Sequence, residues 1–468
     1  MKSDSRQMWR AIRRFALACA ASLTLSSCGL GSDPTITVDP SVRYQTMVGW
    51  EASAQAGHIE CSASAYDRYR DELFDRAVNE LGINRLRIPL RSGVENPADY
   101  FVDNFDKFRS KQITFGDFKK SWYQIVNDND DPEVIDSAGF HFSELDFTIE
   151  KVVLPLKQRV EARGEKLYIN LNYTDFGPSP FEHRDFPAEY AELMVAVFQH
   201  LERRYGWVPD GIEVILEPDN SNWSGKQAGH AIVAAGERLE AAGYRPDFIA
   251  PSDANTTRAI ADFDQLMQVP GAARYVDELA YHRYGGATSE SLQAIGDRAR
   301  SAGVRTAMLE RIGSDYTALH EDLTVAMNSA WQQYALAFCQ TDDKGGLYYL
   351  IDATDPNSPR VTLSSRGRYL RQYFRYVRAG AVRIGAISSS DALSPVAFVN
   401  VDGRHVVVIS SRKRGQVHVE GLPAGTYTVE YVTDAAHEVA PAVSENGAVV
   451  FTLPAAGVAT VFAGEQDN

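Results

Sequence analysis

From residue 46 to residue 379 the chain repeats one pattern, in which a short apolar run precedes a stretch whose apolar residues have helical spacing. In the first helical stretch, Ser64–Leu81, apolar residues recur at i, i+3 and i+4, and Gly82 ends the pattern. Short apolar strands that alternate with helices form parallel sheets covered by helices. Eight such units predict an α/β fold of the (β/α)8 or TIM-barrel type, which takes about 250 residues plus insertions.

The strands of this predicted barrel are read from the apolar, β-branched and aromatic runs. They are Met47–Trp50, Arg85–Pro89, Leu167–Asn172, Ile212–Leu216, Phe248–Ala250, Glu278–Tyr281, Arg305–Leu309 and Gly346–Ile351. A long helix, Tyr316–Cys339, is expected between the seventh and eighth strands.

The pattern changes at Val382, where helical spacing stops and short strand-like runs alternate with turn signals such as Asp402-Gly403 and Asn446-Gly447. This predicts a C-terminal antiparallel β-sandwich. Strand-like residues 35–44, which precede the barrel segment, could complete that sheet. The expected division is a lipoprotein signal peptide (1–27), a linker (28–34), N-terminal strands joining the β-sandwich (35–45), the catalytic barrel (46–379) and the β-sandwich (380–468).

Residues 91–145 are a long insertion after the second strand and are rich in aromatic side chains, including Phe105, Phe118 and Trp122. In a barrel, a long loop at this position lies on the C-terminal face and would wall a cleft. A folded insertion with its own small core is an equal alternative.

The first 28 residues have the order of a bacterial lipoprotein leader: a basic start, the apolar stretch Phe15–Leu25, and Cys28. The stretch is too short to span a bilayer as a mature helix. We therefore expect cleavage before Cys28 and lipidation of its thiol, which would anchor the protein in the bacterial cell envelope. A plain secretory signal with an incidental cysteine is the alternative.

The composition excludes several classes of protein. The chain carries 47 Lys+Arg and 62 Asp+Glu, a formal net charge of −15, whereas nucleic-acid binding needs a basic face. Only Cys61 and Cys339 would remain beyond the lipidated residue. We expect them to stay unpaired, because the predicted fold puts them near opposite ends of the barrel. We also expect a monomer.

No cofactor or metal is expected. The sequence holds no zinc-type His/Cys spacing and no glycine-rich dinucleotide loop after a strand. The acidic run Asp128–Asp131 lacks the glycine and the terminal glutamate of a calcium-binding loop, so we expect a solvated turn there.

Two glutamates follow predicted strands whose ends meet at the C-terminal face of the barrel, where active sites lie. Glu217 follows the fourth strand and Glu310 follows the seventh. Two facing carboxyl groups suit retaining glycoside hydrolysis, with Glu310 as nucleophile and Glu217 as acid and then base. This chemistry needs Glu310 ionised, and we expect Arg87 and Tyr284 to keep it so. It also needs Glu217 protonated at the start, which a partly desolvated setting would favour.

Other polar and aromatic residues near predicted strand ends are candidates for binding a carbohydrate substrate. They are Trp50, Arg87, Asn172, Tyr173, Asn220, Trp223, His282 and Tyr284. Glu51 and Asp175 are further candidates for substrate contact.

These residues resemble the motifs of clan A glycoside hydrolases. The Glu217-Pro218 pair, Arg87, the His282-x-Tyr284 pair and Glu310 match in order. The segment Tyr44–Trp50 and the C-terminal β-sandwich resemble glycoside hydrolase family 30 in particular. The resemblance implies a retaining O-glycosyl hydrolase that cleaves an oligo- or polysaccharide through a covalent glycosyl-enzyme intermediate.

One position departs from the pattern. The clan has Asn before the acid/base glutamate, where it contacts the sugar 2-hydroxyl, and this chain has Leu216. Asn172 or Asn220 could supply that contact instead. Two alternatives stay open: a transglycosylase or another clan A enzyme, and, because of Leu216, a non-catalytic glycan-binding lipoprotein.

Overall fold

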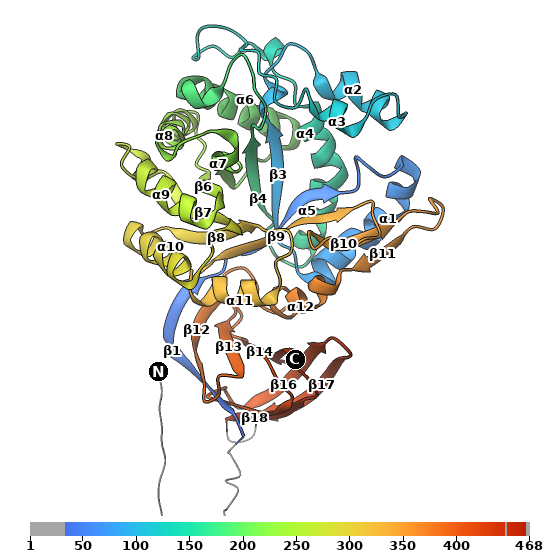
Figure 1. Cartoon of the computed structure of the whole chain (residues 1–468), viewed down its shortest axis with the longest axis vertical. Helices are drawn as coiled ribbons and strands as arrows, with labels where there is room; N and C mark the ends of the chain where they lie inside the picture. Colours follow the sequence, from blue (N-terminus) through green and yellow to red (C-terminus); the bar gives the residue numbers. More distant parts are fainter. Residues whose placement is uncertain (1–32, 445–446, 465–468) are drawn as a thin grey trace, which may run out of the picture. The chain divides into compact units, whose positions relative to one another are not determined.

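The computed structural model describes residues 33–444 and 447–464 (Figure 1). Within them, eight parallel strands close into a barrel, because β9 pairs with β8 on one side and with β2 on the other. This confirms the predicted TIM-barrel fold. The barrel strands are β2 (Gly49–Ala56), β3 (Arg85–Arg91), β4 (Tyr168–Thr174), β5 (Gly211–Glu213), β6 (Asp247–Asn255), β7 (Val276–Gly285), β8 (Arg305–Glu310) and β9 (Ala330–Phe338).

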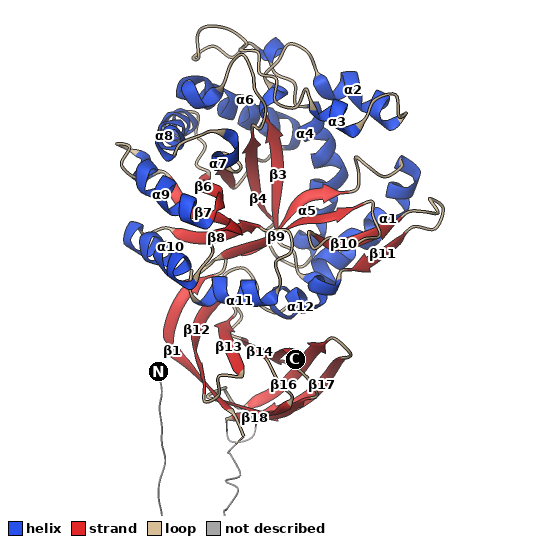
Figure 2. Cartoon of the chain, viewed as in Figure 1, coloured by secondary structure: helices blue, strands red, loops and turns tan. Residues whose placement is uncertain are grey.

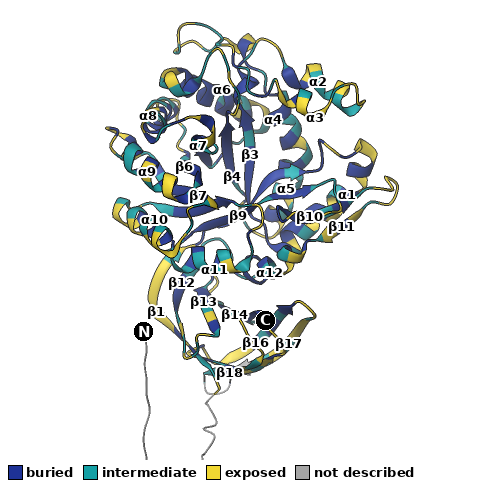
Figure 3. Ribbon diagram, viewed as in Figure 1, coloured by how far each residue is buried: buried dark blue, intermediate teal, exposed yellow. Residues whose placement is uncertain are grey.

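Helices surround these strands (Figure 2). The longer ones are α1 (Ala63–Asp75), α5 (Leu154–Ala162), α6 (Pro187–Tyr205), α8 (Gly225–Ala241), α9 (Thr256–Leu266), α10 (Ser289–Ala302), α11 (Tyr316–Thr324) and α12 (Ser365–Phe374). Ser224 and Thr288 begin α8 and α10 with capping boxes, which satisfy backbone N–H groups that would otherwise lack partners. Buried residues follow the strands and the inner faces of the helices (Figure 3).

The last barrel strand lies earlier in the chain than predicted. The helix expected over Tyr316–Cys339 ends at Thr324, and its second half is β9. The run expected as the eighth barrel strand is β10 (Leu347–Asp352), which pairs with β9 outside the barrel and with β11 (Arg360–Leu363). Most β9 residues are buried on both faces, so the strand lacks the alternation that distinguishes it from a helix.

The C-terminal domain is built on one nine-stranded sheet in the described residues, in the order β17-β16-β19-β14-β13-β12-β1-β15-β18. The strand β18 also contacts β16 and β17, so the sheet folds over into two layers around an apolar core. This confirms the predicted β-sandwich. Its strands are β1 (Thr35–Thr46), β12 (Val382–Ser388), β13 (Leu393–Val399), β14 (His405–Ser411), β15 (Gly415–Glu420), β16 (Gly425–Thr433), β17 (His437–Ser444), β18 (Ala448–Leu453) and β19 (Gly457–Ala463).

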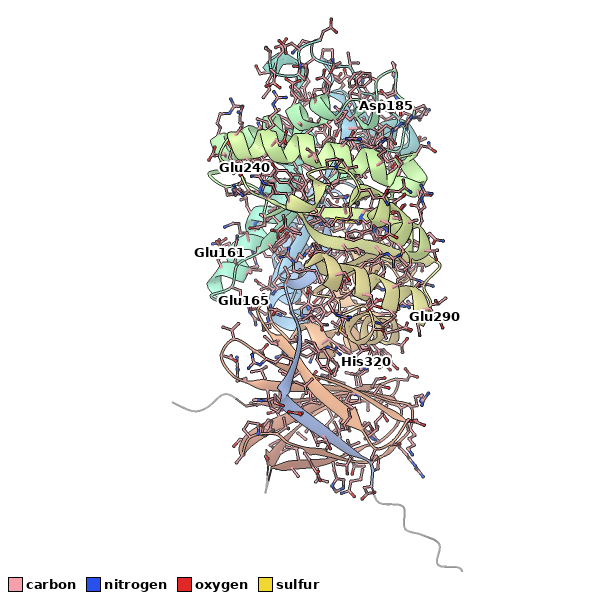
Figure 4. All side chains as sticks on the ribbon, turned by 90° about the vertical axis from the view of Figure 1, so that its left-hand side faces the viewer. Glu161, Glu165, Asp185, Glu240, Glu290 and His320 are labelled. Carbon is pink, nitrogen blue, oxygen red and sulfur yellow. A yellow bond between two sulfur atoms is a disulfide. The ribbon has the colours of Figure 1, made fainter. Side chains whose placement is uncertain are left out.

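Two elements join the β-sandwich to the barrel. The strand β1 pairs with β12 and β15 and then leads directly into the barrel (Figure 4). The helix α12 contacts β16 and β19, and the ring of Tyr376 stacks on Phe462 with centroids 4.1 Å apart. Glu430 is buried there and accepts hydrogen bonds from Arg371 at 2.5 Å and Gln372 at 2.9 Å.

The two cysteines of the barrel segment form a disulfide, which corrects the expectation that they stay unpaired. The Cα atoms of Cys61 and Cys339 are 5.4 Å apart. The expectation was wrong because it placed Cys339 at the end of a helix. The residue instead follows β9, and Cys61 follows the neighbouring strand β2 at the same face of the barrel.

The insertion at residues 91–145 contains α2 (Tyr100–Arg109), α3 (Phe115–Lys119) and the start of α4 (Ser143–Thr148). Its aromatic rings pack together, with Phe118 against Phe101, Phe105 and Phe108, and they are continuous with the core of the barrel. Further residues of the same insertion line a cavity described below, so it both folds on itself and forms a wall.

The predicted signal peptide, Cys28 and most of the predicted linker lie outside the described residues. Across the parts of the chain that the structure describes, no helix has the length and apolar character needed to cross a membrane.

Candidate active site

The structure brings Glu217 and Glu310 together at the C-terminal face of the barrel. Glu310 is the last residue of β8, and Glu217 follows β5 and precedes the short helix α7 (Pro218–Ser221). A carboxylate oxygen of Glu217 lies within 4.8 Å of one of Glu310. Both side chains are largely buried, with 14% and 10% of their surfaces exposed.

The Glu310 carboxylate is held from two directions. Arg87 on β3 donates from Nη1 to Oε2 at 2.6 Å, and the Tyr284 hydroxyl on β7 donates to Oε1 at 3.0 Å. A guanidinium and a hydroxyl that donate to a carboxylate favour its ionised form. These two contacts therefore hold the Glu310 carboxylate in a defined orientation.

Arg87 is itself fixed by a second glutamate beneath it. Its Nε and Nη2 donate to the two carboxylate oxygens of Glu213 at 2.7 and 2.5 Å, and Ser252 donates its hydroxyl to the same carboxylate at 2.5 Å. Burial raises the pKa of Glu213, but the charge and hydrogen bonds of Arg87 outweigh burial and leave the pKa below its ordinary value. Glu213 thus stays ionised inside the barrel and orients Arg87.

The Glu217 carboxylate accepts from two side chains. His282 Nδ1 lies 3.0 Å from Oε1, and Asn220 Nδ2 donates to Oε2 at 2.7 Å. The backbone of Glu217 is left-handed, with φ +48°, as is that of Ser252, with φ +67°. Such conformations cost a non-glycine residue about 1–3 kcal/mol and concentrate at functional sites.

These contacts lower the pKa of Glu217, whereas its partly buried setting was expected to raise it. Burial raises its pKa, but the hydrogen bonds from His282 and Asn220 outweigh burial, and the net pKa is lowered. The expectation that partial desolvation keeps Glu217 protonated is therefore wrong. The reason is that two donors point at the carboxylate from β7 and α7.

A second layer of charge lies deeper in the barrel. Arg85 donates to Glu278 at 2.6 and 3.0 Å and pairs with Glu51, and all three side chains are fully buried. The Asn170 amide links this layer to the site, because it donates to Glu51 at 3.4 Å and to Glu213 at 3.2 Å. Glu51 therefore belongs to the barrel interior and not to a substrate-binding surface.

Two hollows meet at Glu310. A cavity of about 420 Å³ lies on one side, and its lining includes Arg87, Asn172 and Leu216, with Trp122 and Tyr123 from the 91–145 insertion. A hollow of about 510 Å³ on the other side is lined by Glu217, Asn220, Tyr284 and Glu310, among others. Among the described residues, Asn172 Nδ2 is buried without a hydrogen-bond partner.

Three predicted substrate-binding residues lie elsewhere. Trp50 is fully buried, stacks on Phe374 with centroids 4.4 Å apart and donates to the Val377 carbonyl. The strand β2 continues to Ala56, so Trp50 lies near its start and not at its end.

The rings of Tyr173 and Trp223 are buried and pack against each other, with centroids 6.1 Å apart. Tyr173 follows Asn172 along β4, and successive residues of a strand point to opposite faces. Asn172 therefore lines the cavity, whereas Tyr173 contacts the Nδ1 atom of His183 at 2.8 Å. Asp175 likewise accepts from Ser92 at 2.9 Å and does not line either hollow.

Glu213, Ser252 and Asn170 support the site from within the barrel and were not among the predicted site residues. A signal for them was present: Arg85 and Arg87 are two residues apart on one strand, so both point into the barrel and need buried acidic partners.

Comparison with protein families identifies the type of the C-terminal domain. Residues 380–461 match the family model of the glycosyl hydrolase family 30 beta sandwich domain. The expected resemblance to glycoside hydrolase family 30 is confirmed. No curated protein matches the chain.

Solved structures match over nearly all of the chain. The catalytic domain of the family 30 xylanase C from Talaromyces cellulolyticus has 18% identity and a TM-score of 0.66, and the match covers 92% of this chain and 100% of that one. A family 30 endoxylanase from Clostridium papyrosolvens has 16% identity and a TM-score of 0.64, with coverage of 92% and 100%. An endo-β-1,6-glucanase has 16% identity and a TM-score of 0.62, with coverage of 92% and 95%. At these identities, the likeness establishes a shared fold.

Replacing Arg87 with Met should destabilise the protein by about 3–5 kcal/mol, because it leaves Glu213 and Glu310 buried without their cation. Adding Glu213→Gln should recover part of that loss, since it removes one buried charge. Urea unfolding of both variants measures this. Arg204→Met, at an exposed pair with Glu150, is the matched control and should cost less than about 1 kcal/mol. A double variant no more stable than Arg87→Met would contradict the account.

Proposed function

We propose that the protein is a retaining glycoside hydrolase with Glu310 as nucleophile and Glu217 as acid/base. One observation carries the proposal: carboxylate oxygens of the two residues approach within 4.8 Å across the cleft. Carboxyl groups about 5–5.5 Å apart suit retention, whereas inverting enzymes separate theirs by about 6.5–9.5 Å to hold a water between them. The fold of family 30 xylanases and the match of the C-terminal domain support a carbohydrate substrate.

The reaction would proceed in two displacements. In the first, a Glu310 oxygen attacks the anomeric carbon, the glycosidic C–O bond breaks, and the proton of Glu217 moves to the departing oxygen. In the second, the Glu217 carboxylate takes a proton from water, whose oxygen attacks the same carbon and releases Glu310. Both carboxyl groups return to their starting states, and no cofactor is needed.

The two hollows suggest where the substrate lies. We assign the transferred sugar to the cavity walled by Trp122 and Tyr123, and the leaving group to the hollow beside Glu217 and Asn220. The free Nδ2 donor of Asn172 faces the sugar side, where Leu216 offers no hydrogen bond. Asn172 therefore takes over the sugar contact that the residue before the acid/base glutamate would otherwise make.

Glu310→Gln and Glu217→Gln should each lower turnover of an aryl glycoside or polysaccharide by about 10³-fold or more while leaving the fold intact. Glu290→Gln, at an exposed glutamate of α10, is the control and should retain full activity (Figure 4). NMR of the first product should show the anomeric configuration of the substrate. Full activity in Glu310→Gln, or an inverted first product, would refute the assignment.

The acidity of Glu217 predicts the pH profile. Because the first step needs Glu217 protonated and its pKa is lowered, activity should fall on the alkaline side of an acidic optimum. Removing the donor in Asn220→Ala should move the alkaline limb of kcat/KM to higher pH. Asn220→Asp should move it further, because it adds a neighbouring negative charge. If the alkaline limb of kcat/KM lies at the same pH in both variants as in the wild type, Glu217 does not control that limb.

A non-catalytic glycan-binding protein is the second candidate, favoured by Leu216 and by the ionised state of Glu217. Glycan binding by calorimetry without release of reducing sugar would support it. A transglycosylase or another clan A activity would be recognised by transfer of the sugar to an added acceptor.

For localisation, we propose a lipid anchor at Cys28, which lies outside the described residues. The order of basic start, apolar stretch and cysteine supports it. In a bacterial host, Cys28→Ala should move the protein from the membrane fraction to the soluble fraction. Unchanged fractionation would exclude the anchor.

A further inference from the structure

A second acidic cluster lies where the 91–145 insertion meets α6. It consists of Asp128 from the insertion and Glu189 and Glu192 from the first turns of the helix. Glu189 and Glu192 are three residues apart, so they share one helix face. One carboxylate oxygen of each of the three residues lies within 4.8 Å of the others.

The two helix glutamates are buried side by side, close enough for a hydrogen bond between their carboxyl groups when one of them is protonated. Glu192 is 1% exposed and Glu189 is 8% exposed. When both are ionised, neither oxygen of Glu192 has a hydrogen-bond partner in the described part of the chain, and Oε2 of Glu189 also lacks one. A buried carboxylate without a donor or a cation is costly, so this arrangement calls for a positive ligand.

The surrounding protein groups do not supply that charge by direct contact. The imidazole of His183 is paired with Glu95 at 2.6 Å. In the described part of the chain, Nη1 of Arg238 on α8 is buried without a hydrogen-bond partner, so it does not donate to Glu192. Asp128 accepts from groups of its own loop, among them the backbone N–H of Asp136 at 2.6 Å.

We propose that Asp128, Glu189 and Glu192 bind a divalent cation of the calcium type. The set offers only oxygen ligands, which a hard cation prefers, and Ca²⁺ binds oxygens at about 2.3–2.6 Å in irregular geometries. Oxygens up to 4.8 Å apart can therefore share one ion. The buried, unpartnered Oδ1 of Asn127 is a further candidate ligand from the same insertion.

The ion would join two elements that are far apart in sequence. The insertion that carries Asp128 also supplies Trp122 and Tyr123 to the cavity wall. A cation between Asp128 and α6 would hold that wall against the barrel. The expected solvated turn is correct for Asp130 and Asp131, which are exposed, but not for Asp128, which faces the helix.

The test uses the mature protein after EDTA treatment and dialysis. Calorimetric titration with CaCl2 should give one ion per chain, and 1 mM CaCl2 should raise Tm by about 2–4 °C or more. Both effects should disappear in Glu192→Gln and in Asp128→Asn. Glu202→Gln, at an exposed residue of the same helix, should respond like the wild type. Without calcium, Glu192→Gln should be at least as stable as the wild type, since a neutral amide replaces a carboxyl group that is buried beside another carboxyl group.

Absence of calcium binding and of a Tm shift in the wild type would overturn the proposal and leave Glu189 and Glu192 sharing a proton. Binding that persists in both variants would place the ion elsewhere and would also overturn it. Because the wild-type titration needs no variant, the proposal is testable even if a substitution prevents folding. The site does not depend on glycosidase activity, so the two proposals fail separately.

Discussion

The site depends on the contact between Arg87 and two glutamates inside the barrel. Glu213 binds one edge of the guanidinium from below, which leaves Nη1 directed at Glu310. If the buried guanidinium of Arg87 had a carboxylate on one side only, its charge would be incompletely compensated or the side chain could change position. With both partners present, Glu310, the proposed nucleophile, is fixed by strands β3, β5 and β8 and not by loops. That arrangement is the preorganisation that charge-stabilising catalysis requires.

The interior of this barrel is unusually polar. Barrel interiors are dominated by branched apolar residues, whereas Arg85, Glu51 and Glu278 form a charged layer here beneath Arg87. Asn170 connects the two layers through its amide. Because several charged side chains are buried here, moving any one of them costs free energy, since the displaced ion loses its partner. The lower layer therefore restricts how Arg87 and Glu213 can move.

Much of the fold followed from the sequence, because helical and strand spacing are local signals. The error at β9 shows the limit: a strand buried on both faces has no alternation, and its Ala, Leu and Gln residues also suit a helix. That error also hid the disulfide, since it moved Cys339 to the wrong end of the barrel.

The candidate site was also predicted only in part. Glu217 and Glu310 could be proposed because residues that follow parallel strands share one face. Trp50 and Tyr173 were misplaced because a shift in strand end or in alternation turns a side chain to the other face. Glu213 and the calcium-type cluster depend on contacts between distant segments, which spacing along the chain does not reveal.

We propose that Glu310 attacks the sugar from a fixed position while Glu217 donates and accepts the proton. Incubation with an activated 2-deoxy-2-fluoro glycoside of a substrate sugar, followed by peptide mass spectrometry, tests it most directly, because the fluorine slows breakdown of a covalent intermediate. The account predicts one glycosyl adduct per chain, attached to Glu310. An adduct on Glu217, or turnover of the unmodified glycoside with no adduct formed, would contradict it.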